Sequence, residues 1–257
     1  MLISIITPTY NRGRYPFLKD ICQSIAIAKT YDHLEIEHLI VNDGSNDETE
    51  QMILDMQKTF LYTRYIKNTE NKGLTFSKNR ALHEARGEFI LDVDDDDIVP
   101  FYALGLRLRL LVESEKGWLC GNGLKINEDG VLQFTENLLG YSIENKWECF
   151  RAFYEGKLFA YAGTRIYRRE ALERIQGWNE DIPTLCEDFD LWLRLTASCG
   201  SPAFSPIPLI YWREKACSLG INALKSGDYF SALASIKQCY RALYEQSLNS
   251  IAYAYRK

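Results

Sequence analysis

Five aspartates stand within six residues, directly after an apolar run that ends at Leu91. The segment reads Asp92-Val93-Asp94-Asp95-Asp96-Asp97. Carboxylates this close repel one another and raise each other's pKa, unless a positive charge lies among them. A divalent cation with oxygen ligands supplies such a charge and commonly accompanies phosphate groups. A solvated acidic loop is the alternative, but apolar residues frame this run on both sides, which favours a site for a metal and a phosphate-bearing ligand.

A second acidic pair, Glu187-Asp188, opens a helical pattern at residues 187–197. Carboxylates near a helix N-terminus are stabilised by the helix dipole. An aspartate at that position is about as often an N-cap as a functional group. On the residues alone, both interpretations of this pair stay open.

The first hundred residues must position these groups, and they alternate between short apolar runs and helical patterns. Strands are expected at residues 2–7, 36–41, 62–67 and 88–91, with helices around 18–25, 47–60 and 74–86. Continuously apolar strands in this alternation predict a mainly parallel sheet covered by helices on both faces. Ligands bind at the carboxyl ends of such strands. We therefore expect the polar clusters after Thr7, Val41 and Leu91 to share one edge.

The later part of the chain has a looser pattern. We expect helices at 101–115, 169–175 and 187–197, and strands or extended segments at 118–126, 161–167 and 202–211. A helical pair around Gly227, within residues 221–244, predicts a C-terminal helical hairpin with a packing role. The expected domain spans residues 1–218 and divides into two halves, 1–100 and 101–218. Residues 219–257 form a helical extension.

Length and composition narrow the class of protein. The chain has 257 residues, of which 46% are hydrophobic, enough for one large α/β domain. A net charge of −5 argues against nucleic-acid binding. Seven scattered cysteines without a CxxC pair indicate free thiols in a reducing compartment. No signal peptide or membrane span is expected, which predicts a cytoplasmic protein, with peripheral contact at the inner face of the membrane left open.

Four segments occur in an order that points to a family: residues 5–12, 41–47, 91–95 and 186–194. Together they resemble the family 2 glycosyltransferases, inverting enzymes of the Rossmann-like GT-A fold, over about residues 2–218. The resemblance implies transfer of a sugar from a nucleotide-sugar, with UDP favoured, to a hydroxyl of a glycan or lipid-linked acceptor. It further implies that residues 1–100 are the nucleotide-binding half and residues 101–218 the acceptor half of a GT-A domain, and that the protein has a place in cell-surface polysaccharide biosynthesis. The sequence does not identify the sugar, the acceptor, the linkage or the oligomeric state.

The resemblance also implies the residues that bind the donor. They are Pro8, Thr9, Tyr10, Asn11, Arg12, Asp43, Lys78, Asn79, Asp92, Val93, Arg213 and Ser218. Asp43 can accept the imide N–H of a base, and the alternative is an Asx-turn or a helix N-cap. Lys78 stands where the family usually has Arg, so a single ammonium charge replaces a planar guanidinium group. The alternative to a donor-binding role for Lys78 is a position on a solvated helix face. Arg213 can clamp a diphosphate, although the residues between it and Ser218 depart from the family pattern.

The metal and catalytic assignments come from the same resemblance. Asp94 is expected to coordinate Mn²⁺ or Mg²⁺, Asp92 to meet the ribose or the metal, and Asp95 to complete the acidic group. Asp188 is expected to be the general base, positioned by Glu187, in a single displacement that inverts the anomeric carbon. Asp96 and Asp97 follow the aspartates of the family's usual motif and have no counterpart in it.

Other classes were weighed against this interpretation. A haloacid-dehalogenase phosphatase usually has a hydroxyl residue where Asp96 stands. An EF-hand would need Gly and Glu where the chain has Asp97 and Ala103. An inactive nucleotide-binding or scaffold protein of GT-A fold stays as the alternative. The three histidines, His33, His38 and His83, match no family position and are expected to be structural.

Overall fold

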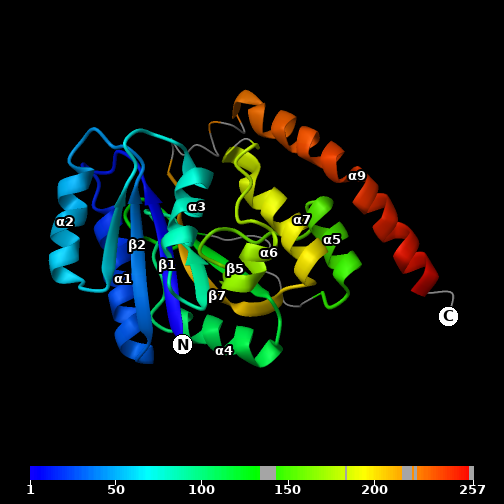
Figure 1. Cartoon of the computed structure of the whole chain (residues 1–257), viewed down its shortest axis with the longest axis horizontal. Coiled ribbons are helices and arrows are strands. Elements are labelled where there is room, and N and C mark those ends of the chain that lie inside the picture. Colours follow the sequence, from blue (N-terminus) through cyan, green and yellow to red (C-terminus); the bar gives the residue numbers. More distant parts are fainter. Residues whose placement is uncertain (134–142, 183, 216–221, 223–224, 255–257) are drawn as a thin grey trace.

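The computed structural model describes residues 1–133, 143–182, 184–215, 222 and 225–254 (Figure 1). Within these residues, seven strands form one sheet in the order β3-β2-β1-β4-β6-β5-β7. Helices cover both of its faces (Figure 1). The predicted α/β class and the mainly parallel sheet are therefore confirmed.

The first half of the sheet is entirely parallel. It consists of β1 (Leu2–Thr9), β2 (Glu35–Asn42), β3 (Thr63–Lys67) and β4 (Phe89–Asp92). Thr9 pairs with Asn42, and Ile6 pairs with Asp92, so β1, β2 and β4 end close together. This register confirms that the polar clusters after these strands share one edge.

The helices that connect these strands are α1 (Phe17–Asp32), α2 (Thr49–Thr59) and α3 (Leu74–Glu84). The helices α2 and α3 differ from their expected ranges by one or two residues at their ends, whereas α1 continues seven residues beyond the expected range of 18–25. Ile3 and Ile5 of β1 face one core cluster, and Ile6 faces the other. Because both faces are buried, the strand reads as a nearly continuous apolar run.

The second half of the sheet is mixed. It contains β5 (Trp118–Ile126), β6 (Ile166–Arg168) and β7 (Ala203–Arg213). β6 is antiparallel to both β4 and β5, whereas β5 and β7 are parallel. The expected strand at 161–167 is too long at its start. Gly163 has a positive φ of 73°, and the N–H of Thr164 bonds back to the carbonyl of Tyr161 at 3.1 Å, so the chain turns before β6 begins.

The helices of this half are α4 (Ala103–Ser114), α5 (Lys146–Tyr154), α6 (Arg169–Arg174) and α7 (Glu187–Cys199), with a 3₁₀ turn at Thr184–Cys186. Our sequence analysis did not predict α5. Its N-cap is Asn145, whose side-chain oxygen accepts the N–H groups of Trp147 (2.9 Å) and Glu148 (3.1 Å). An Asn followed three residues later by Glu was the local signal for this helix.

The last described element is one long helix, α9 (Asp228–Ala254), which packs against α5 and against the 3₁₀ turn that precedes α7 (Figure 1). The hydroxyl of Tyr240 donates to Asp190 at 2.6 Å, and that of Tyr244 donates to Glu155 at 2.8 Å. The second arm of the predicted hairpin is thus present and packs as expected, but it runs on to Ala254. The first arm lies largely outside the described residues.

Two expectations from composition can be checked in the described part of the chain. Six cysteines there are free thiols, and four of them are buried. No described helix combines the length and the apolar character that crossing a membrane requires.

Candidate functional site

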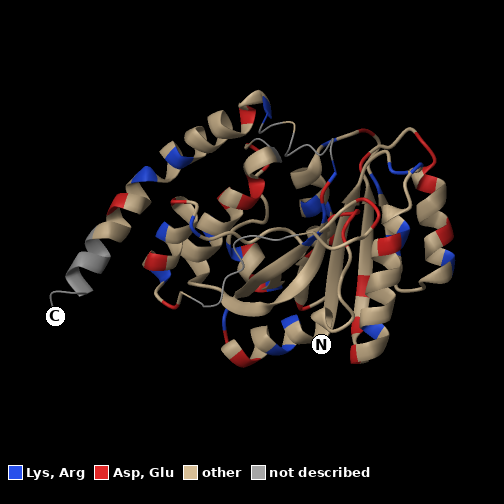
Figure 2. Ribbon diagram, turned by 180° about the vertical axis from the view of Figure 1, so that it is seen from behind, with Lys and Arg blue, Asp and Glu red and all other residues tan. Residues whose placement is uncertain are grey.

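The candidate site lies at the carboxyl ends of β1, β2 and β4, where acidic and basic segments gather in the loops (Figure 2). We call residues 92–97 the acidic lip. Asp95 is buried and accepts a hydrogen bond from the Thr9 hydroxyl at 2.6 Å and from Arg12 Nε at 2.9 Å. Burial raises the pKa of Asp95, and Arg12 opposes that rise. The turn that follows β1 therefore contacts the acidic lip. This contact agrees with the prediction that the segments after these strands share one edge of the sheet.

The last two aspartates of the lip are tied to the end of β7. Asp96 forms ion pairs with Arg12 (3.5 Å) and with Lys215. Asp97 is buried and accepts the backbone N–H of Arg213 at 3.0 Å. Burial raises the pKa of Asp97, and the charges of Asp94 and Asp96 add to the rise. These two residues, which had no assigned role, join β7 to the lip.

Asp92 is enclosed by donors. It is fully buried and accepts from Lys78 Nζ at 3.2 Å, from Tyr167 Oη at 3.0 Å, and from Arg165 through Nε (3.3 Å) and Nη2. Burial opposes ionisation, but the two cations outweigh it and lower the pKa of Asp92 to about 2. Its carboxylate is therefore neutralised within the protein, and its predicted contact with ribose or metal stays a prediction.

Asp94 is in the opposite situation, although only one residue separates it from Asp92. It is half-buried, and its carboxylate makes no hydrogen bond or ion pair with any residue that the structure describes. Burial raises the pKa of Asp94 to about 6, Lys78 opposes the rise, and the charges of Asp96, Asp188 and Asp92 add to it. Among the carboxylates of the acidic lip, Asp94 is thus the one whose oxygens no described residue engages, and its predicted role as a metal ligand stays a prediction.

A divalent metal fits this donor set only with help from a ligand. Across the described ranges, no group of three or more His, Cys, Asp or Glu side chains is arranged to hold a metal by itself. Mg²⁺ and similar ions are commonly held by one or two carboxylates plus substrate phosphates. The unpaired carboxylate of Asp94 meets that need. Asp95 shares its oxygens with Thr9 and Arg12, so its role as a ligand stays a prediction.

Asp43 holds the loop that leads into α3. Its Oδ1 accepts from Asn68 Nδ2 (2.6 Å) and from the N–H of Lys72 (2.9 Å), and its Oδ2 accepts from the N–H of Gly73 (2.8 Å). A structural role for this carboxylate is thus present. The predicted base contact stays a prediction, and it would use the lone pair left on Oδ2.

The first turn is fastened to the segment after β2. Asn11 adopts a positive φ of 53°, and its side chain accepts the N–H of Asn46 at 3.0 Å. The N–H of Arg12 donates to Thr49 Oγ1 at 2.7 Å. Pro8 and Val93 are buried, and Tyr10 is exposed. The donor contacts predicted for these residues are untested, but the turn that carries them is held in place.

Lys78 is not on a solvated helix face, so that alternative was wrong. Its side chain is 1% exposed and lies 5.7 Å from the centre of the Trp178 ring. Burial opposes its charge, but Asp92 raises the pKa of Lys78. Asn79 is bound to the same loop: it accepts from the N–H of Trp178 at 2.8 Å and donates to Glu180 at 2.7 Å. Both side chains fasten α3 to this loop, and their predicted donor contacts stay predictions.

Arg213 also has a structural set of partners. Its guanidinium donates to the carbonyls of Asp96 (2.8 Å) and Glu128 (2.6 Å) and pairs with Asp20 at 3.2 Å. The predicted diphosphate clamp therefore competes with these bonds and stays a prediction. Lys215, which pairs with Asp96, is a second cation at this position that our sequence analysis did not single out. Ser218 lies outside the described residues.

The acidic pair opens α7 without capping it. The N-cap residue is Cys186, which makes no side-chain capping bond, and the helix begins at Glu187. The capping interpretation was therefore wrong. Glu187 is buried; its burial raises its pKa to about 8, with Asp188 adding and Lys78 opposing. Asp188 is 24% exposed and pairs with Arg165 Nη1 at 2.6 Å.

Arg165 joins the two acidic motifs, and sequence reasoning missed it. It is fully buried and donates to Asp92, to Asp188 and, at 2.9 Å, to the carbonyl of Ala160. The antiparallel register of β4 and β6 pairs Ile90 with Tyr167, which brings Arg165 next to Asp92. A single arginine before a three-residue strand gives no local signal of this role. One guanidinium thus holds the acidic lip and the candidate base within the same site.

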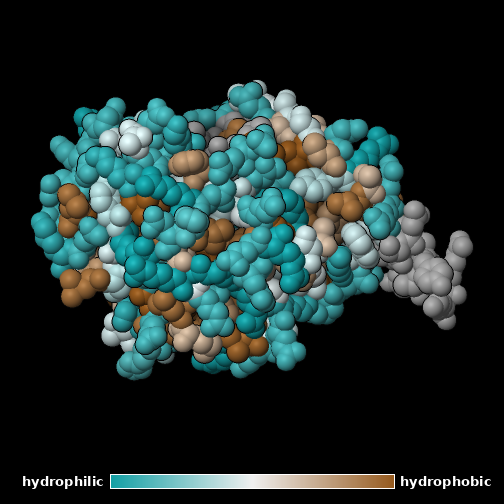
Figure 3. All heavy atoms as spheres, in the orientation of Figure 1, coloured by the Kyte–Doolittle hydropathy of each residue, from teal (hydrophilic) through white to brown (hydrophobic). Residues whose placement is uncertain are grey.

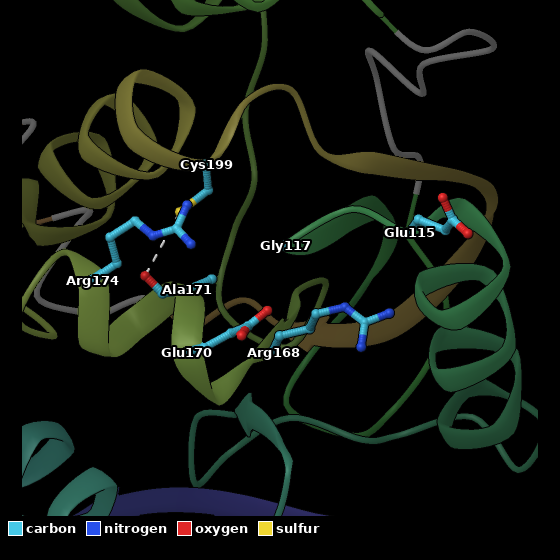
Figure 4. A pocket seen from close by; sticks show the side chains of 7 residues that line it. All are labelled: Glu115, Gly117, Arg168, Glu170, Ala171, Arg174 and Cys199. Carbon is cyan, nitrogen blue, oxygen red and sulfur yellow. Dashed lines mark hydrogen bonds between the residues drawn. The ribbon is translucent and has the colours of Figure 1, made fainter.

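A separate pocket of about 200 Å³ lies elsewhere (Figure 4). Its lining residues are Glu115, Gly117, Arg168, Glu170, Ala171, Arg174 and Cys199. Arg168 pairs with Phe89, the first residue of β4, so this pocket lies at the opposite end of that strand from Asp92. It contains none of the predicted site residues.

Comparison with known proteins bears on the family of this chain. The sequence model described as Glycosyl transferase family 2 matches residues 4–176, well over half of the chain. A GalNAc(5)-diNAcBac-PP-undecaprenol beta-1,3-glucosyltransferase of Campylobacter jejuni is 27% identical over 201 residues, which cover 75% of this chain and 59% of that protein. Against this protein and two further curated glycosyltransferases, from Bacillus subtilis and Streptococcus pneumoniae, the chain spans 27% to 59% of the relative's length.

Solved structures show the same fold. S. aureus TarS (residues 1–349), in complex with UDP-GlcNAc, has a TM-score of 0.70 and 22% identity, covering 85% of this chain and 60% of that one. The mannosyltransferase PcManGT from Pyrobaculum calidifontis, in complex with GDP-Man and Mn²⁺, has a TM-score of 0.65 and 16% identity, with 99% and 75% coverage. At these identities the likeness concerns the fold.

Proposed function

Because this chain belongs to glycosyl transferase family 2, we propose that it is an inverting, metal-dependent glycosyltransferase that uses a nucleotide-sugar donor. The observation that carries the proposal is the position of Arg165 between Asp92 and Asp188. It brings the candidate base into the same site as the acidic lip, although 96 residues separate the two aspartates in sequence. A transferase needs both groups around one anomeric carbon.

In the proposed reaction, Asp188 accepts the proton of the acceptor hydroxyl while its oxygen attacks the anomeric carbon of the donor. The bond from that carbon to the diphosphate oxygen breaks, and the nucleoside diphosphate leaves with the bonding electron pair. One displacement inverts the configuration, and no covalent bond to the protein forms. The partial exposure of Asp188 and its bond to Arg165 suit this role, because the carboxylate is both accessible and held in one orientation.

Asp94 would hold the metal, together with oxygens of the diphosphate. A bound Mn²⁺ or Mg²⁺ supplies positive charge that stabilises the departing nucleoside diphosphate. Arg12 and Lys215, which pair with the lip, add positive charge near the same position. The Mn²⁺ in PcManGT supports this part of the proposal at the level of the fold.

The substrates are proposed from the relatives. TarS was solved with UDP-GlcNAc, and the Campylobacter relative is named for a lipid-linked acceptor. We propose a UDP-sugar donor and an acceptor that is a glycan or a lipid-linked saccharide, in the synthesis of a cell-surface polysaccharide. A lipid-linked acceptor requires the enzyme to work at a membrane surface.

The test is a screen of UDP-, GDP-, ADP- and TDP-sugars for thermal stabilisation of the protein, with and without Mn²⁺, followed by product analysis. We expect one nucleotide class to raise Tm only when Mn²⁺ or Mg²⁺ is present, and transfer to a saccharide acceptor to give an inverted linkage. Nucleotide binding without turnover, across donors and saccharide acceptors, would instead identify an inactive binding protein. No stabilisation by any nucleotide would reject the donor site altogether.

A further inference from the structure

Two aromatic side chains lie exposed beside the candidate base. Phe159 and Tyr161 are 38% and 53% exposed, and their rings are parallel, with centroids 5.7 Å apart. Both rings meet Trp192 edge to face, at centroid distances of 6.1 and 6.3 Å. We call Phe159 and Tyr161 the aromatic platform. Trp192 is itself buried, so it fixes the orientation of the two rings from below.

The platform is joined to the catalytic side of the site through the residue between its two rings. The carbonyl of Ala160 accepts Arg165 Nη1 at 2.9 Å and Trp192 Nε1 at 2.6 Å. The same Nη1 of Arg165 binds Asp188 at 2.6 Å. The backbone of the platform and the carboxylate of Asp188 are therefore held by one nitrogen atom.

A third aromatic residue approaches from α9. Burial raises the pKa of Tyr161, and the charges of Tyr229 and Asp188 add to that rise. The same carboxylate affects Tyr229, at the start of α9, whose pKa is also raised, mainly by burial. Tyr161, Tyr229 and Asp188 thus lie within electrostatic reach of one another. The surroundings of Asp188 are aromatic on this side and acidic or basic on the side of the lip.

We propose that the aromatic platform binds a pyranose ring of the acceptor and places one of its hydroxyls against Asp188. The face of an aromatic ring carries excess electron density and attracts the polarised C–H groups of a sugar ring, while the hydroxyls stay free for polar partners. A nucleoside diphosphate needs accessible cations, and Arg12 and Lys215 supply them at the acidic lip. Arg165, the cation beside the platform, is fully buried and already paired with Asp92 and Asp188. The occupant is therefore a neutral saccharide of the acceptor, and this assignment rests on the function proposed above.

The experiment measures saccharide binding without turnover. The protein, saturated with UDP and Mn²⁺, is titrated with the methyl pyranosides of glucose, galactose, N-acetylglucosamine and N-acetylgalactosamine, and tryptophan fluorescence is followed. Trp192 contacts both rings of the platform and serves as the reporter. The variants are Tyr161→Ala, Phe159→Ala and the conservative Tyr161→Phe, which keeps the ring. The matched control is Tyr31→Ala, because Tyr31 is 61% exposed on α1 and lies outside the site.

We expect at least one glycoside to bind the wild type, and Tyr161→Ala to weaken that binding roughly tenfold. Phe159→Ala should have a smaller effect in the same direction, and Tyr161→Phe and Tyr31→Ala should bind as the wild type does. In a transfer assay the same change should appear in KM for the acceptor, with KM for the donor unchanged. UDP affinity should be equal in all variants.

Three results would overturn the proposal. The first is that no glycoside binds the wild type, and the second is that glycoside binding survives in both Tyr161→Ala and Phe159→Ala. The third comes from a parallel measurement of binding to phosphatidylglycerol vesicles, in which the alanine variants lose affinity for the vesicles but not for the glycosides. The last result would make the platform a membrane contact. Failure of the wild type to bind UDP is a different result, since it would reject the nucleotide site; the glycoside titration would then be carried out without UDP and would still test the platform.

Discussion

The acidic lip and the N-terminus of α7 both present carboxylates to the site, but they are held by different means. In the lip, Asp95 and Asp96 are paired with cations from neighbouring loops, and Asp97 caps a backbone N–H at the end of β7. At α7, Asp188 depends on one buried guanidinium, and Glu187 is buried with a raised pKa.

The difference shows how a site can carry many acids at once. The lip spreads its charge over several partners, so the loss of one partner leaves the others in place. At α7, Asp188 pairs with Arg165, and the same guanidinium also pairs with Asp92. We therefore expect the loss of Asp188 or Arg165 to have a larger effect than the loss of a paired acid of the lip, and the following variants test that order.

The largest effect on catalysis is expected for Asp188→Asn. The amide keeps the shape of the side chain but cannot accept the proton of the acceptor, so kcat should fall by roughly 10²–10⁴-fold. Nucleotide affinity, measured by calorimetry, should be unchanged, and Asp181→Asn at an exposed position nearby should behave as the wild type does. Retained transfer in Asp188→Asn would mean that another group is the base.

Arg165→Met should have the largest effect on stability. It leaves Asp92 buried with only Lys78 as a cationic partner and removes the charge partner of Asp188, and breaking a buried ion pair on one side costs about 3–5 kcal/mol. Arg165→Lys should recover only part of this loss, because an ammonium cannot reach Asp92, Asp188 and the Ala160 carbonyl together. Urea unfolding measures both, with Arg109→Met on the exposed face of α4 as the control. Equal stability of Arg165→Met and the wild type would contradict the linking role.

Asp94→Ala should abolish the effect of Mn²⁺ on nucleotide affinity. We expect the affinity measured with Mn²⁺ to fall at least about tenfold, to the value found without metal. Asp129→Ala, in an exposed turn, is the control, and Asp96→Ala should show a smaller loss because Asp96 is already paired. A full Mn²⁺ response in Asp94→Ala would place the metal elsewhere.

Glu187→Gln should give the smallest effect, and its sign depends on pH. The folded pKa of about 8 exceeds the ordinary value of 4.5, so between these values the folded protein binds more protons than the unfolded chain. The contribution of Glu187 to stability therefore falls as pH rises from 4.5 to 8. Without metal or nucleotide, the variant should be close to the wild type in stability near pH 4.5 and more stable than the wild type near pH 8.5, where the wild type must ionise a buried carboxyl group. Urea unfolding at both values measures this, with Glu170→Gln as the exposed control; a difference that does not change with pH would show that Glu187 does not titrate in this range.

Sequence reasoning placed the elements of the first half well because they depend on local patterns. The apolar runs became β1, β2, β3 and β4 in the expected order, and their parallel register brought Thr9 to Asp95. It was less successful after residue 100. There α5 was not predicted, and the strand expected at 161–167 is in fact the shorter β6, Ile166–Arg168. There the elements are short and are fixed by turns such as the one at Gly163 rather than by periodicity.

The sequence by itself determined which acids lie at the ends of strands and at the start of α7, because the alternation of apolar and polar residues dictates where each element stops. Only the tertiary structure decided which of those acids are neutralised. Asp92 and Asp94 are nearly identical in sequence context, yet the antiparallel strand β6 brings Arg165 to Asp92 and leaves Asp94 without a partner among the described side chains. Charge pairing across 73 residues depends on strand register, and register is set by the packing of the whole sheet.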